Sequence, residues 1–157
     1  MRLILILAIG LTARGEGLLR LGTGFLPAAE DGRYWALATG YRAGFDEEGI
    51  RLARHGRQVR VRFPGASLRW EGSGSRGARV NGAGPGYEEI RAREAFAGVD
   101  IVVRMREGRL KTEFQLAAGV GAEVARYCVD GAAVRAEDGG RTLAVDAGEG
   151  WSWKEVG

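Results

Sequence analysis

The sequence predicts an all-β fold, an antiparallel β-sandwich-like domain made of many short strands and hairpins. Three observations support this prediction. Glycine accounts for 27 of the 157 residues, and only three prolines accompany it. Apolar and polar residues alternate in short runs, as they do in strands, whose successive side chains point to opposite faces. Turn signals separate these runs every ~8–12 residues, a spacing typical of sandwiches and barrels.

The first element is an N-terminal segment typical of a secretory signal peptide. Residues 1–13 contain one basic residue, Arg2, then an apolar run from Leu3 to Leu11 and a small residue, Ala13. Export machinery removes such a segment, and the run is shorter than the ~20 residues that span a bilayer. We therefore expect a secreted or envelope protein that does not span the membrane after signal removal. A buried first strand is the alternative, although the run lacks strand alternation.

The rest of the chain, residues 25–157, is expected to form one domain, because its length suits a single two-layer core. Residues 96–98 and 117–125 also suit a short helical turn. The expected strands cover residues 34–39, 41–45, 50–53, 58–63, 67–70, 87–93, 99–105, 110–116, 124–129, 133–136, 141–146 and 151–155.

Glycine marks the turns between these strands, since it supplies the positive φ angles that tight turns need. Clear examples are Glu107-Gly108 and Asp130-Gly131. Residues 72–86 hold few apolar side chains and are expected to form a glycine-rich surface loop. Their GxGxxG match has no helix after it, so nucleotide binding is not predicted.

The hairpin over residues 98–116 is the most informative element. Folding it about Glu107-Gly108 places Arg106 opposite Arg109 and separates two faces. The apolar face carries Val99, Ile101, Val103, Met105, Leu110, Thr112, Phe114 and Leu116. The polar face carries Asp100, Arg104, Lys111, Glu113 and Gln115, with Val102 as its single apolar residue.

Asp100 and Glu113 form the first candidate site, because two carboxylates on one sheet face are what a glycosidase uses. Arg104 and Lys111 share that face and would keep both carboxylates ionised, which does not suit a general acid. An ion-paired cross-strand network is therefore predicted. A carbohydrate-active enzyme or glycan-binding domain remains the alternative function.

Arg60 and Arg62 form the second candidate site, in the densest basic stretch of the chain. They alternate with Val59 and Val61 and so share a solvent face. This face is either an ordinary solvated surface or an anion-binding stripe for a polysaccharide or a phospholipid headgroup. Nucleic acid is not expected, because an exported protein rarely meets it and aromatic residues are not interleaved with the arginines.

Trp151 and Trp153 form the third candidate site, since they share one face of the last expected strand. Such a pair either stacks on sugar rings or fills the core. His55 and Cys128 are the sole histidine and cysteine, so the sequence shows neither a typical zinc site nor an internal disulfide. No cofactor is predicted.

Short motifs also relate the hairpin to a family. Residues 98–101 read Gly-Val-Asp-Ile, residues 110–114 read Leu-Lys-Thr-Glu-Phe, and residues 118–120 read Ala-Gly-Val. With these motifs the chain resembles the uncharacterised N-terminal domain of bacterial exported cell-surface proteins, often found ahead of SBBP-type β-propeller repeats. The resemblance implies export and a β fold. We therefore expect an exported, non-enzymatic structural or binding module of the cell envelope, with a glycan or another envelope protein as its partner.

Overall fold

Antiparallel strands make up most of the protein. The computed structural model describes residues 4–8, 24–27, 32–79 and 85–156, which contain fourteen strands and two short 3-10 helices, η1 (Ala122–Val124) and η2 (Asp138–Gly140). The strands are β1 (Ile4–Ala8), β2 (Phe25–Pro27), β3 (Tyr34–Ala38), β4 (Tyr41–Asp46), β5 (Gly49–Arg54), β6 (Arg57–Arg62), β7 (Trp70–Arg79), β8 (Pro85–Phe96), β9 (Val99–Arg106), β10 (Arg109–Leu116), β11 (Cys128–Asp130), β12 (Ala133–Glu137), β13 (Thr142–Asp146) and β14 (Ser152–Val156).

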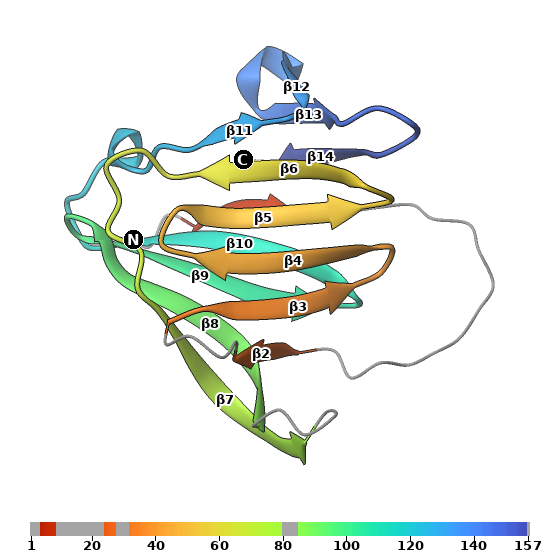
Figure 1. The fold of residues 1–157 in the computed structure, drawn as a ribbon. Helices are drawn as coiled ribbons and strands as arrows, with labels where there is room; N and C mark the ends of the chain where they lie inside the picture. Colours follow the sequence, from red (N-terminus) through yellow and green to blue (C-terminus); the bar gives the residue numbers. More distant parts are fainter. Residues whose placement is uncertain (1–3, 9–23, 28–31, 80–84, 157) are drawn as a thin grey trace.

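One curled sheet provides both layers of the molecule. Its order is β1-β10-β9-β8-β2-β3-β4-β5-β6-β11, and β7 pairs with β8 as a branch. Near its start β8 pairs with β2 through Tyr87, whereas its later residues pair with β9, so the sheet turns over at this strand. Figure 1 shows β3 to β6 as one layer in front of β9 and β10. The all-β, sandwich-like prediction is confirmed.

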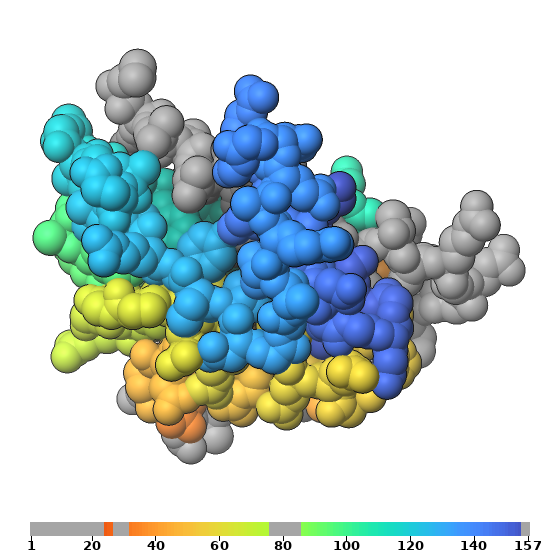
Figure 2. Space-filling view, turned by 90° about the horizontal axis from the view of Figure 1, so that it is seen from above, coloured from red at the N-terminus to blue at the C-terminus, as the bar shows by residue number. Residues whose placement is uncertain are grey.

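A second, three-stranded sheet, β12-β13-β14, contains the last part of the chain. Figure 2 shows the segments after β10, coloured cyan to blue, covering the upper end of the molecule. In the described part, no helix is long and apolar enough to cross a membrane.

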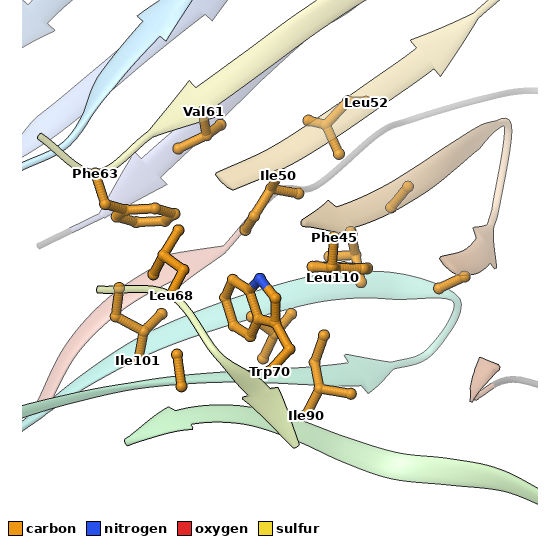
Figure 3. Packing of buried hydrophobic residues seen from close by; sticks show 14 of the residues in the cluster. Phe45, Ile50, Leu52, Val61, Phe63, Leu68, Trp70, Ile90, Ile101 and Leu110 are labelled. Carbon is orange, nitrogen blue, oxygen red and sulfur yellow. The ribbon is translucent and has the colours of Figure 1, made fainter. Parts of the chain in front are cut away.

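The core lies between the two layers of the curled sheet. Phe45, Ile50 and Leu52 face it from the front layer and are at most 2% exposed. Trp70 lies among them and the residues of the rear layer (Figure 3), and its indole N–H donates a 2.9 Å hydrogen bond to the carbonyl oxygen of Asp46. Aromatic rings meet edge to face here, as the 5.6 Å between the ring centroids of Phe45 and Trp70 shows.

The hairpin of β9 and β10 has the predicted register. Arg106 is paired with Arg109, and the two turn residues, Glu107 and Gly108, have φ of 51° and 73°. Positive φ at both positions is the mark of a type I′ turn, whose twist matches the flanking strands. Its apolar face is buried, with only Met105 half-buried.

The tip of this hairpin is fastened to the front layer. The backbone N–H of Thr39 donates to the carbonyl oxygen of Gly108 at 2.7 Å, and that of Leu110 donates to the Tyr41 hydroxyl at 3.1 Å. Tyr41 is 3% exposed, and burial raises its pKa to about 12. The two layers are therefore joined by polar contacts as well as by the apolar core.

The expectation of a surface loop over residues 72–86 is wrong for most of that segment. β7 continues to Arg79 and pairs with β8, which already begins at Pro85, and residues 80–84 lie outside the described residues. Gly72 serves packing, because a Cβ at this position would lie 2.5 Å from the ring of Tyr87. The backbone N–H of Gly72 also donates to the Tyr34 hydroxyl at 2.9 Å.

The segment expected to be a strand over residues 124–129 also differs. It contains the end of η1 and the start of the short β11, so the helical turn expected within residues 117–125 is confirmed. The helical turn expected over residues 96–98 is wrong, because Phe96 ends β8 and residues 97 and 98 form the turn into β9. The predicted signal peptide lies partly outside the described residues, namely 1–3 and 9–13. Residues 4–8 form β1, which pairs with β10 from Ile4 opposite Gln115 to Ala8 opposite Lys111. Removal of this segment stays a prediction.

Candidate functional site

Arg104 is the centre of an ion-paired network on the polar face of the rear layer, which contains β8, β9 and β10 (Figure 1). Its guanidinium lies 2.6 Å from the Glu89 carboxylate of β8 and also pairs with Glu113 of β10. Lys111 lies 3.6 Å from Glu113 on the same strand. Burial by itself would lower the pKa of Arg104, but the hydrogen bonds and charges of Glu113 and Glu89 raise it above its ordinary value. The predicted cross-strand network is confirmed for Glu113, which Arg104 and Lys111 both contact, whereas Asp100 pairs with Arg91 instead.

Asp100 belongs to a second part of this network. Its carboxylate accepts a 3.1 Å hydrogen bond from Arg91, which also contacts Glu89 at 3.2 Å. The other Asp100 oxygen accepts a 2.9 Å hydrogen bond from the backbone N–H of Glu94, whose φ is 46°. This contact stabilises the irregular register of β8 between Ala92 and Phe96.

Asp100 and Glu113 are thus bound to different arginines, an arrangement that holds three strands together. Val102 lies between them on this face and is fully buried. The sequence did not indicate Glu89 and Arg91, since nothing in the hairpin shows which strand pairs with β9.

Arg60 and Arg62 lie on the outer face of β6, turned away from the core, as predicted. The Arg62 guanidinium is 2.5 Å from the Asp130 carboxylate of β11. This hydrogen bond lowers the pKa of Asp130 and raises that of Arg62. Arg60 pairs with Glu48 and lies 3.7 Å from Asp46. The arginine stripe therefore has carboxylates of the same chain beside it.

A depression of about 560 Å³ lies beside this pair. Phe63, Leu68 and Pro64 give it an apolar side, and charged groups line the rest. Its lining residues are Glu47, Glu48, Arg60, Arg62, Phe63, Pro64, Leu68 and Asp130. Charged residues outnumber apolar ones in this lining and the depression is open to solvent, so it differs from the enclosed, mostly apolar pockets of small-molecule sites and suits a polar, anionic ligand bound at the surface.

Trp151 and Trp153 are core residues, and a sugar-stacking role for them is wrong. They are 2% and 3% exposed, and their ring centroids lie 5.8 Å apart. Strand alternation places both on one face, as predicted, but that face packs inward with Val145.

Trp35 is the tryptophan that reaches solvent, at 40% exposure, and sequence reasoning did not single it out. The signal was available, because Trp35 alternates with Tyr34 and Ala36 in the expected strand 34–39 and so belongs to the opposite face.

The remaining candidates have ordinary positions. His55 is exposed in the turn between β5 and β6, with a φ of 46°, and Cys128 is a free, half-buried thiol. Within the described ranges, no group of three or more His, Cys, Asp or Glu side chains is placed to hold a metal ion.

Comparisons with known proteins found no matching family model, no matching curated protein and no matching solved structure. The resemblance to the N-terminal domain of exported cell-surface proteins therefore stays a prediction.

Proposed function

We propose that this protein is an exported, non-enzymatic binding module of the bacterial cell envelope, with a glycan or another envelope protein as its ligand. Two features of the sequence support export: the signal-like residues 1–13 and the resemblance to exported cell-surface domains. The depression beside Arg60 and Arg62 is the observation that carries the binding role.

The ion pairs around this depression are weak enough for a ligand anion to displace a carboxylate from its arginine. Glu48 and Asp130 are 62% and 48% exposed, and exposed ion pairs contribute only ~0–1 kcal/mol. An anionic group of a ligand can therefore replace either carboxylate at little cost, while an apolar part of the ligand contacts the exposed Pro64. Arginine suits this task, because its planar donor fork matches carboxylate and phosphate groups.

Binding is tested with purified protein and an envelope polysaccharide fraction from the source cell, by co-sedimentation. Arg60→Ala and Arg62→Ala are expected to weaken binding. Arg57→Ala is the matched control, since Arg57 is 47% exposed and pairs with Glu149 at 2.9 Å away from the depression. Equal binding by all three variants and the unmodified protein would remove the depression from the proposal.

Export is tested separately by locating the native protein in the source cell and sequencing its N-terminus. We expect a processed product outside the cytoplasm. An unprocessed cytoplasmic product would contradict the proposal, whatever the binding result.

A further inference from the structure

Trp35 occupies an unusual place for a large apolar side chain. It projects from β3 on the outer face of the front layer, at 40% exposure. Trp70, Trp151 and Trp153 are at most 3% exposed, which is the common state of an indole that contributes to folding. Trp35 therefore keeps a large part of its side chain at the surface, unlike the other three tryptophans.

Gly44 lies directly opposite Trp35 on β4 and leaves bare backbone beside the indole. A Cβ built on Gly44 would have no heavy atom within 4 Å, so packing does not require glycine there. Gly44 also lacks a positive φ, so the backbone does not require it either. A glycine within a strand weakens the strand and often marks a place where a ligand approaches the backbone.

Charged groups border this bare area. Arg42 is exposed two residues before Gly44 and makes no ion pair with another described residue. Arg51 is opposite Gly44 on β5, and its partner Asp46 lies 3.1 Å away. The same row continues to Arg60, since Arg51 is paired with Arg60 on β6. Three strand spacings of ~4.8 Å place Arg60 about 14 Å from Trp35.

We propose that Trp35, Gly44 and Arg42 form a stacking platform for an acidic polysaccharide. One sugar ring lies over Gly44 with its C–H face against the indole, and Arg42 binds a carboxylate of the polymer. This inference rests on the proposed function, because it names the ligand class and extends the site beyond the Arg60 and Arg62 depression.

The position of the stacking platform favours a polysaccharide over a peptide. Extended peptides usually join the free edge of a sheet through main-chain hydrogen bonds. β3 and β4 are interior strands, paired on both sides, so their backbone polar groups are already used. A single exposed indole, with most nearby arginines already paired, is also unlike a surface for nucleic acid, where bases stack on successive aromatic residues.

The experiment measures binding of purified protein to polygalacturonate, alginate and hyaluronate, with neutral dextran for comparison, by calorimetry. Trp35→Ala is expected to weaken binding to the acidic polymer about ten-fold or more, as loss of a stacking contact does. Gly44→Val should weaken it similarly, because its methyl groups would stand where the ring lies. Gly44→Val leaves the fold intact, since the space above Gly44 is open. Arg42→Ala should lower the affinity for acidic polymers several-fold.

Val134→Ala and Arg135→Ala are the matched controls, because both residues are exposed on β12, away from the front layer. They should bind as the unmodified protein does. The inference would be overturned if Trp35→Ala and Gly44→Val left binding unchanged. It would also be overturned if the protein bound dextran as tightly as the acidic polymers, or if it preferred an extended peptide or single-stranded nucleic acid. Failure to bind any of the three acidic polymers would also overturn it, and would leave the evidence for export untouched.

Discussion

At the scale of single residues, Tyr41 shows how one polar atom joins the two layers. Its hydroxyl lies in the core and accepts a 3.1 Å hydrogen bond from the backbone N–H of Leu110. Tyr41→Phe would leave that N–H buried without an acceptor, so the free energy of unfolding should fall by about 1–3 kcal/mol. Urea unfolding measures this loss. Tyr87→Phe, which keeps its ring contact with Tyr34, is the control and should change stability little.

Tyr41 also predicts a pH dependence of stability. Burial raises its pKa to about 12 from 10.0, so the folded protein holds this proton more tightly than the unfolded chain. The contribution is complete below pH 10 and is lost as the pH rises toward 12, at most about 3 kcal/mol. Urea midpoints between pH 9 and pH 12 should therefore fall more steeply for the unmodified protein than for Tyr41→Phe. Parallel curves would contradict this assignment.

The tryptophans show what the sequence can and cannot predict about single residues. Alternation correctly assigned Trp151 and Trp153 to one face and makes Trp35 the outward residue of its strand. Whether a face is covered depends on which layer packs against it, and that is decided by segments far away in the chain. For this reason the strand pattern left both a surface and a core position open for Trp151 and Trp153, and the fold places them in the core.

At the scale of elements, two turn glycines separate the cost of a strained backbone from the cost of a steric clash. One of them is in the β9–β10 hairpin. Gly108 and Gly56 both have positive φ, 73° and 80°, in two-residue turns. A Cβ on Gly108 would lie 2.2 Å from Oγ1 of Thr39, whereas a Cβ on Gly56 would have nothing within 4 Å.

Gly56→Ala should therefore lower the unfolding free energy by about 1 kcal/mol, the cost of the backbone conformation alone. Gly108→Ala should lower it by about 1–3 kcal/mol more, because the neighbouring turn must move. Thermal unfolding of both variants tests this difference. Thr39→Ala in the Gly108→Ala background should recover part of the loss, and equal losses at the two glycines would argue against the docked turn.

The network of the rear layer predicts an effect of Arg104. Arg104→Met would leave Glu89 and Glu113 facing each other without their shared cation. The side chain of Arg104 is 23% exposed, so we expect a loss of about 1–3 kcal/mol, between the values for exposed and buried pairs. Added salt should reduce the loss by screening the two carboxylates.

Arg106→Met provides the control, because Arg106 is exposed and makes no ion pair with another described residue. Asp100→Ala and Glu113→Ala should likewise lower stability while leaving any glycan hydrolysis unchanged. A loss of hydrolysis without a loss of stability would favour the enzyme alternative.

Elements defined by local signals were predicted well. The register of β9 and β10 follows from one turn and one alternating pattern, both read from residues 98–116. β7 was missed because its glycines suggest a loop, and only Tyr87, from another strand, explains Gly72. Glu89 and Arg91 were missed for a related reason, since the neighbour of β9 is set by the tertiary fold.

At the scale of the whole molecule, β1 closes the outer side of β10. A protein comprising residues 14–157 should leave the backbone of residues 111–115 unpaired there, and an open edge favours pairing with another chain. We expect this shortened protein to stay folded and to associate more strongly than the full chain, whose sheet ends in β1 beside β14. Under the export proposal the shortened protein is the processed form. Light scattering at several concentrations measures this, and a shortened protein that stays monomeric throughout would contradict the expectation.

The sequence predicts the all-β architecture, but it does not predict the order of the strands in the sheet. Strand rhythm and glycine-marked turns predict an all-β sandwich-like domain. The order of the strands depends on β8, which pairs with β7, β9 and β2 at once. No local pattern in residues 85–96 indicates three partners.

If the protein is exported as proposed, the pairing of β1 with β10 sets a timing requirement. Ile4 pairs with Gln115, so this ladder can form only after residues 4–115 have been synthesised. Pairings between such distant segments form slowly. A ladder that formed before export would hide residues 4–8 from a translocation channel. Slow closure of the sheet would therefore favour export.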